Sequence, residues 1–192
     1  MTCNLNELSK GELGQLFPII ISDYNSDWAK IFLLEKQNIL SITEPGIILR
    51  IEHIGSTAVP GLCAKPTIDI LIEISDNTDC NLLIDNLQKI QYQYIPRPDN
   101  PPPHIMLAKG YSIKGFTGQA FHIHIRYSGD WDEIVFRNYL INNPDVAHEY
   151  GELKRKLSIE YRNDREKYTD SKGDFISGIT KTARRINKQN IS

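Results

Sequence analysis

PTIDILIEIS, residues 66–75, alternates strictly between two kinds of position. Isoleucine occupies 68, 70, 72 and 74, and the positions between them hold Thr, Asp, Leu, Glu and Ser. A period of two is the period of a β-strand, because successive side chains point to opposite faces. The stretch therefore predicts a strand with one buried apolar face and a second face that carries polar groups.

The segments around this strand predict an α+β fold. Apolar residues recur at helical spacing over 28–42, and residues 47–54 are short and β-branched, which is typical of a strand. A further helix is expected near 82–90, and strands at 105–107 and 121–127 are separated by a glycine-bearing turn over 109–118. From residue 130 onward the pattern is helical. We expect a small mixed sheet flanked by helices, with a helical C-terminal third.

Length and composition predict one globular domain. The chain has 192 residues, of which 40% are hydrophobic and 24% charged. We interpret residues 1–17 as a leader and 18–192 as a single domain, with its sheet in about 18–128 and its helical part in about 129–188. A net charge of -2 argues against a dedicated nucleic-acid binder, and no apolar run is long enough to cross a membrane.

The cysteines point to a reducing compartment. Cys3, Cys63 and Cys80 are scattered, odd in number and without CxxC spacing, so neither a disulfide framework nor a zinc-thiolate site is expected. We therefore expect a cytoplasmic protein. Its oligomeric state stays open.

Charge is distributed unevenly along the chain. Residues 1–149 carry a net charge of -7, whereas residues 150–192 contain 11 Lys and Arg against 6 Asp and Glu. A basic C-terminal third packed on an acidic body can be plain electrostatic complementarity with solvated helix faces, or it can be an anion-binding wall. The sequence leaves both interpretations open.

A first candidate site follows the predicted strand 47–54. His53, Gly55, Ser56 and Thr57 lie where a strand ends, and a Gly-Ser turn lets the backbone approach a phosphate closely. Asp69 follows on the polar face of the next strand, where a carboxylate must be solvated, paired or bound to metal. The alternative is an ordinary turn next to an exposed strand aspartate.

A second candidate is FHIHIR, residues 121–126. Period two places His122, His124 and Arg126 on one face of a strand. Two histidines at i and i+2 can reach one metal ion, or can bind one phosphate together with the arginine. A structural zinc is disfavoured because no cysteine lies nearby in sequence. An exposed strand face with incidental histidines is the alternative.

A third candidate is the basic side chains of the helical part. Several of them lining one groove would neutralise a polyphosphate, although each could equally be an ordinary surface charge. The set is Arg137, Lys154, Arg162, Arg165, Tyr168 and Lys172.

Long stretches of the sequence resemble the GrpB family. The resemblance is carried by IEHIGSTAVPGLCAKPTIDI (residues 51–70), by the histidine strand at 122–126, by FRNYL (136–140), by ELK (152–154) and by NDREKYT (163–169) with Lys172. It covers about residues 18–186. It implies a nucleotidyltransferase-like fold, in a family whose members occur alone or fused to dephospho-CoA kinase.

The resemblance also implies what a nucleotidyltransferase site would need. Such sites have Gly-Ser followed by an Asp-x-Asp or Asp-x-Glu pair, with a third carboxylate on a later strand. Gly55, Ser56 and Asp69 fit this pattern, but the second carboxylate position holds Leu71, and the later strand offers histidines instead. Two-metal catalysis needs several carboxylates, so this departure argues against ordinary nucleotidyl transfer.

Three functions remain as hypotheses. The favoured one is a protein that binds a nucleotide or a CoA-like ligand, that is, a small anionic molecule, at a degenerate nucleotidyltransferase-type site. The alternatives are an active metal-dependent nucleotidyl or phosphoryl transferase, and an interaction protein that acts through its C-terminal helices. Asp69 is the predicted catalytic residue. With His122 and His124 it is also the predicted ligand set for a divalent cation, Mg²⁺ or Mn²⁺ in preference to Zn²⁺. The predicted ligand-binding residues are His53, Gly55, Ser56, Thr57, Lys65, His122, His124, Arg126, Arg137, Lys154, Tyr168 and Lys172.

Overall fold

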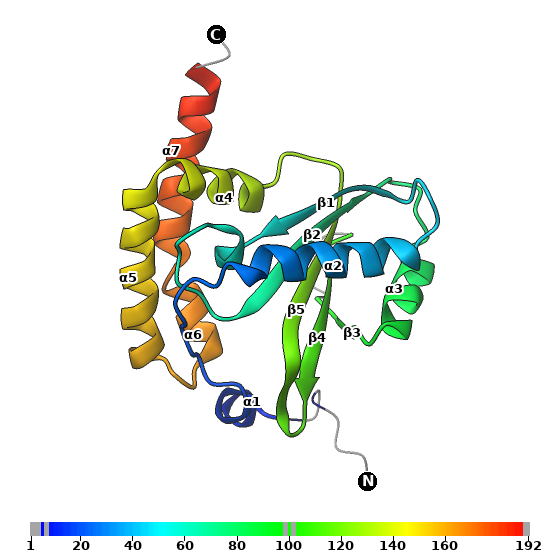
Figure 1. Ribbon diagram of the computed structural model, residues 1–192, viewed down its shortest axis with the longest axis horizontal. Helices are drawn as coiled ribbons and strands as arrows, with labels where there is room; N and C mark the ends of the chain where they lie inside the picture. The colour runs from blue at the N-terminus through cyan, green and yellow to red at the C-terminus, as the bar shows by residue number, and fades with distance from the viewer. Residues whose placement is uncertain (1–4, 6–7, 98–99, 101–102, 190–192) are drawn as a thin grey trace.

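A five-stranded mixed sheet forms the centre of the chain in the computed structural model (Figure 1). The structure describes residues 5, 8–97, 100 and 103–189. The strand order is β1-β2-β5-β4-β3, and β2 and β5 run parallel while the other neighbours are antiparallel. The strands are β1 (Ile48–Ile54), β2 (Thr67–Ile74), β3 (Gln93–Ile95), β4 (Ile105–Ser112) and β5 (Gly115–Tyr127).

Helices flank this sheet, which confirms the α+β class. They are α1 (Lys10–Leu16), α2 (Asp27–Ser41), the short 3-10 helix η2 (Ser56–Ala58), α3 (Cys80–Lys89), α4 (Asp132–Asn142), α5 (Pro144–Glu160), α6 (Arg165–Asp170) and α7 (Gly173–Gln189). In Figure 1, α2 crosses one face of the sheet, and α5, α6 and α7 gather beside it. Among the helices of the described ranges, none is long and apolar enough to span a membrane.

The alternation in β2 separates the two faces of the sheet. Its isoleucines 68, 70, 72 and 74 are fully buried and pack with Trp28 and Phe32 of α2 and with Leu83 and Leu87 of α3. The register of the parallel pair aligns Asp69 with His122 and Glu73 with Arg126. Since aligned residues share a face, the apolar core lies under α2 and α3, and the polar residues face the other side.

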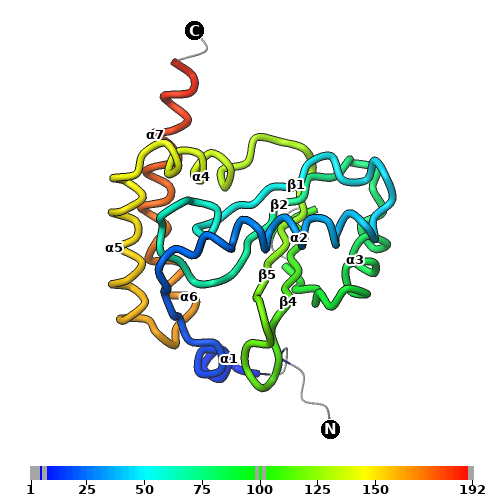
Figure 2. The backbone as a smooth tube through the Cα atoms, in the orientation of Figure 1, coloured from blue at the N-terminus to red at the C-terminus, as the bar shows by residue number. Residues whose placement is uncertain are grey.

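The loop between β1 and β2 connects the sheet to the helical part. Val59 and Leu62 of this loop are buried against Leu140, Ala147 and Tyr150 of α4 and α5. Figure 2 shows the loop reaching from the sheet toward α5 and α6. The C-terminal helices therefore pack onto the segment that carries the Gly-Ser turn, which brings their basic residues to the sheet.

Two details differ from the sequence predictions. The turn expected over 109–118 is wrong: β4 and β5 continue through most of it as a long hairpin, and the pairing slips between Lys109 and Tyr111. Gly110, at φ +90°, occupies that irregularity, where an added Cβ would overlap the Gln119 carbonyl oxygen. The glycine thus marks a bulge within a strand. The short strand β3 was also not expected.

The end of the expected leader is packed against the domain. Ser9 and Glu12 form a capping box at the start of α1, and an added Cβ on Gly14 would overlap the carbonyl of Asn163. Phe17 is 3% exposed and makes ring contacts with Tyr111 and Phe116 of the long hairpin. Residues 1–4 and 6–7 of the leader lie outside the described residues.

Candidate functional site

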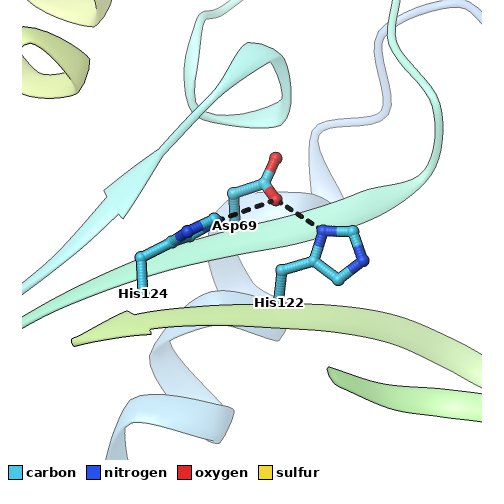
Figure 3. A group of neighbouring side chains, drawn as sticks. All are labelled: Asp69, His122 and His124. Carbon is cyan, nitrogen blue, oxygen red and sulfur yellow. Dashed lines mark hydrogen bonds and ion pairs between the residues drawn. The ribbon is translucent and has the colours of Figure 1, made fainter. Parts of the chain in front are cut away.

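Asp69, His122 and His124 converge on the polar face of the sheet. The Oδ1 atom of Asp69 lies 3.1 Å from Nδ1 of His122 and 3.9 Å from Nε2 of His124. Figure 3 shows both imidazole rings, from β5, directed at the same carboxylate on β2. The three side chains are 15–28% exposed, so solvent reaches them. The parallel pairing of β2 with β5 creates this group, which we call the Asp-His triad.

Gly55 makes room for the carboxylate of the triad. Its φ is +70°, and a Cβ added to it would lie 2.5 Å from Oδ2 of Asp69. Only glycine combines this backbone conformation with such a close approach at little cost. The Gly-Ser turn predicted to hold phosphate is thus directly adjacent to Asp69, with Oδ2 facing the turn and Oδ1 facing the histidines.

Hydrogen bonding controls the ionisation of Asp69. Burial alone would raise the pKa of this carboxyl, but the hydrogen bond with His122 and the neighbouring imidazole of His124 outweigh it and hold the pKa below its ordinary value. Asp69 is therefore an anion at neutral pH.

Tyr111 extends the triad, and the sequence prediction missed it. Its hydroxyl lies 2.8 Å from Nε2 of His122, on the side of the ring opposite Asp69. The two rings also stack, with centroids 5.6 Å apart. Residue 111 was predicted to lie in a turn, and nothing in the sequence places it beside a histidine eleven residues away.

Two lysines flank Tyr168 close to the triad. The Nζ atoms of Lys65 and Lys172 lie 5.5 Å and 4.1 Å from the centroid of the Tyr168 ring, which is 1% exposed. Such contacts with an aromatic face stabilise an ammonium group partly, but they do not neutralise it. The charge of Asp69 acts on both lysines, which places them in its electrostatic neighbourhood.

Lys154 is the third cation of this region. Only 2% of it is exposed, its ammonium group donates to the carbonyl of Cys63, and it lies 4.8 Å from the centroid of Tyr150. We call Lys65, Lys154 and Lys172 the lysine cluster. Within the described part of the chain, no carboxylate oxygen lies within 4.0 Å of any of these three ammonium groups.

The lysine cluster holds its positive charge weakly. Burial, together with the charges of Arg165 and Lys172, lowers the pKa of Lys65 to about 8. Burial also lowers the pKa of Lys172 to about 8 and that of Lys154 to about 7. Each lowered pKa means that the folded chain disfavours the charged form of the lysine. An anion that binds beside these ammonium groups would stabilise that charged form.

Tyr150 and Ser56 join the two halves of the region. Burial raises the pKa of Tyr150, while a hydrogen bond with Ser56 acts in the opposite direction. Ser56 begins η2 directly after Gly55, and Tyr150 lies on α5 one turn before Lys154. Tyr150 is not among the residues predicted from the sequence to bind a ligand. Its hydroxyl lies at the junction of the Gly-Ser turn with the helical part.

His53 and Thr57 do not belong to this region. His53 lies on the core face of β1, where its ring stacks on Phe32 of α2 with centroids 4.8 Å apart. Burial lowers its pKa to about 4, so the ring is neutral. The Thr57 hydroxyl lies 3.0 Å from Nε2 of His53 and donates to the Thr67 carbonyl at 3.1 Å. Both residues hold η2 against the sheet.

Arg126 and Arg137, the two arginines in the predicted ligand-binding set, also lie against protein groups. Arg137 of α4 donates to Oε2 of Glu52 at 2.8 Å and to the carbonyl of His53 at 2.6 Å, which links the helical part to β1. Arg126 is 8% exposed, and its guanidinium lies 5.9 Å from the Trp131 ring, beyond His124 on β5. Neither joins the lysine cluster.

Comparison with known proteins agrees with this architecture. Residues 18–182 match the family described as GrpB protein. The chain belongs to the GrpB family. A crystal structure of conserved protein GrpB from Enterococcus faecalis is 33% identical and has a TM-score of 0.75, with 88% of this chain and 99% of that chain covered.

Two further GrpB relatives differ in length. Glutamate-rich protein GrpB of Alkalihalophilus pseudofirmus is 31% identical over 90% of this chain and 96% of its own. A dephospho-CoA kinase of Mycobacterium leprae is 27% identical over 67% of this chain, but the match covers only 37% of that enzyme. The GrpB region is thus one part of that longer protein.

The carboxylates of a nucleotidyltransferase-type magnesium site are not available here. Leu71 occupies the second carboxylate position and is fully buried. Arg50 binds both oxygens of Glu73, at 2.6 Å and 3.1 Å, and Arg137 binds Glu52. Asp69, whose partners are the two histidines, is the one carboxylate among these positions without an arginine partner. A pair of magnesium ions held by several carboxylates does not fit this set.

Proposed function

We propose that the chain binds a small ligand with two or more phosphate groups, such as a nucleotide or a CoA precursor, at the lysine cluster beside Asp69. The observation that carries this proposal is a set of three buried or half-buried lysines without a carboxylate partner in the described residues. Buried ammonium groups are normally paired, because removing them from water is costly. An anion from outside the chain would supply the missing partner.

The surroundings of the cluster favour phosphate over a simple anion. Ser56 and Tyr150 offer hydroxyl groups at the Gly-Ser turn, and Gly55 leaves its backbone open to close approach. Arg165 lies within electrostatic range of Lys65 and Tyr111. Several cationic and hydroxyl donors on one side of a sheet suit a ligand with many acceptor oxygens. We include dephospho-CoA among the test ligands because it stands in the name of the Mycobacterium leprae relative.

The proposal is binding without nucleotidyl transfer. Only Asp69 among the carboxylates discussed above is free to hold an ion, and two-metal transfer needs more. An active transferase, the alternative drawn from the sequence, would release pyrophosphate from ATP. The proposal predicts that no pyrophosphate is released.

Calorimetric titration of the full chain with ATP, dephospho-CoA and adenosine tests the proposal. ATP and dephospho-CoA should bind, and adenosine should not, because it lacks phosphate. Lys65→Ala or Lys172→Ala should weaken ATP binding by about 10- to 100-fold, the size of one lost charge-assisted hydrogen bond. Each should also make binding less sensitive to salt.

Lys156→Ala is the matched control, because Lys156 is an exposed lysine of α5 outside the cluster. It should leave ATP affinity unchanged. Equal losses in Lys156→Ala and Lys172→Ala, or equal affinity for ATP and adenosine, would contradict the proposal.

A further inference from the structure

The donor atoms of the Asp-His triad suit a single ion. One nitrogen from each of His122 and His124 and one oxygen from Asp69 all lie within 4.8 Å of one another. Donors that share one ion at about 2.1 Å can be at most about 4.2 Å apart. The Asp69 oxygen already satisfies this limit toward both histidines, at 3.1 Å and 3.9 Å.

The chemistry of these donors selects the kind of ion. Mg²⁺ prefers oxygen ligands in octahedral geometry, and two of the three donors here are imidazole nitrogens. Imidazole suits Zn²⁺, Cu²⁺, Fe²⁺ and Ni²⁺, and two histidines with one carboxylate form a recurrent binding set that leaves coordination positions open. The sequence disfavoured zinc because no cysteine lies near the histidines, but that absence excludes only thiolate sites.

We propose that Asp69, His122 and His124 bind one transition-metal ion of the Zn²⁺ class in preference to Mg²⁺. Three protein donors leave coordination positions on such an ion open. The inference rests on the proposed function in one respect only, namely that these open positions could accept a phosphate oxygen of the ligand. Metal binding itself is independent of phosphate.

Tyr111 provides a second, independent observation. Histidines that bind metal usually place their other ring nitrogen against an oxygen, which fixes the tautomer and the ring orientation. Nδ1 of His122 faces Asp69, and Nε2 faces the Tyr111 hydroxyl at 2.8 Å. With the metal on Nδ1, the Nε2 hydrogen is donated to Tyr111. The ring is thereby held in the orientation that the ion needs.

A purely structural role for the triad explains less of its geometry. One hydrogen bond from His122 would satisfy Asp69, as it does at 3.1 Å. It would not explain why His124 directs Nε2 at the same oxygen from 3.9 Å, beyond hydrogen-bond distance, on a face that solvent reaches. Three donors around a common centre are explained by an ion.

Titration of the chelator-treated full chain with Zn²⁺ alone tests the proposal. Competition with a chromophoric chelator should show one ion per chain, and an excess of Mg²⁺ should not displace it. Residues that hydrogen-bond a metal ligand typically contribute about 10- to 100-fold to metal affinity. Tyr111→Phe should therefore weaken Zn²⁺ binding by an amount within this range, whereas His124→Ala, which removes a ligand, should weaken it by more. His148→Ala, at an exposed histidine of α5, should bind Zn²⁺ as the wild type does.

Co²⁺ in place of Zn²⁺ identifies the donors. The visible spectrum should show nitrogen and oxygen coordination without a thiolate charge-transfer band. Asp69→Asn, which preserves shape, should lose this spectrum while keeping the wild-type melting curve in the absence of metal. Unchanged Zn²⁺ affinity in His124→Ala, equal affinity for Mg²⁺, or a thiolate band would overturn the proposal. Because no phosphate is present, none of these outcomes bears on ATP binding.

Discussion

The lowered pKa values of the lysine cluster predict that ATP binding takes up protons. Lys65 and Lys172 have pKa values of about 8, because burial disfavours their charged forms. Near pH 8 each is half protonated, and a bound anion favours the charged form, so binding should take up about one proton per ATP from these two groups. Lys154, with a pKa of about 7, would raise the uptake toward about two protons if the ligand also neutralises it.

Calorimetry in buffers of different ionisation enthalpy measures this number directly. A phosphate monoester has a second pKa of about 6, so near pH 8 the ligand itself contributes few protons. Near pH 6 the lysines are already charged, so the uptake by these lysines should fall toward zero. The Lys65→Ala, Lys172→Ala double variant should remove the uptake, and Lys156→Ala should keep it. ATP binding near pH 8 without proton uptake would refute the reasoning.

Three further predictions concern stability and are checked by urea unfolding. Lys154→Met should flatten the pH dependence of the free energy of unfolding. The pKa of Lys154 is about 7 in the folded chain against an ordinary value of 10.5, so the unfolded chain binds more protons between these two pH values. The free energy of unfolding of the wild type should therefore rise with pH over this range, by up to about 4–5 kcal/mol. A variant with the same rise would contradict this. Gly55→Ala should cost about 1–3 kcal/mol, because alanine is strained at φ +70° and its Cβ would meet Asp69; an unchanged unfolding midpoint argues against that strain. Arg137→Ala should cost about 1.5–3 kcal/mol by removing the bonds between α4 and β1, and a loss below the error of the measurement would show that this link contributes nothing.

The sequence predicts correctly which face of the sheet a side chain occupies where apolar and polar residues alternate along a strand. The strict alternation around Asp69, together with the period of the strand at 121–126, indicates one polar face, and the parallel register then aligns Asp69 with His122. The same reasoning fails for His53. Its place on β1 is opposite in phase to Glu52, so its ring enters the core beside Phe32. Proximity in sequence to a Gly-Ser turn does not decide which face a strand residue occupies.

Long-range contacts account for what the sequence does not predict. Gly110 looks like a turn residue, and only the pairing of β4 with β5 shows that it allows a bulge that brings Tyr111 to His122. For the basic C-terminal third, the sequence left two interpretations open, solvated helix faces and an anion-binding wall. Packing distinguishes its members, since Lys154 is buried in the cluster while Lys156, two residues later, is exposed.

A crystal structure of the full chain grown with ATP and Zn²⁺ tests the central claim most directly. The account predicts phosphate oxygens within hydrogen-bond distance of the Lys65 and Lys172 ammonium groups, and an anomalous zinc peak between Asp69, His122 and His124. Phosphate bound elsewhere would contradict it, for example in the 600 Å³ hollow beside Lys109 and Gln119 or in the 240 Å³ hollow between Gly61 and His148.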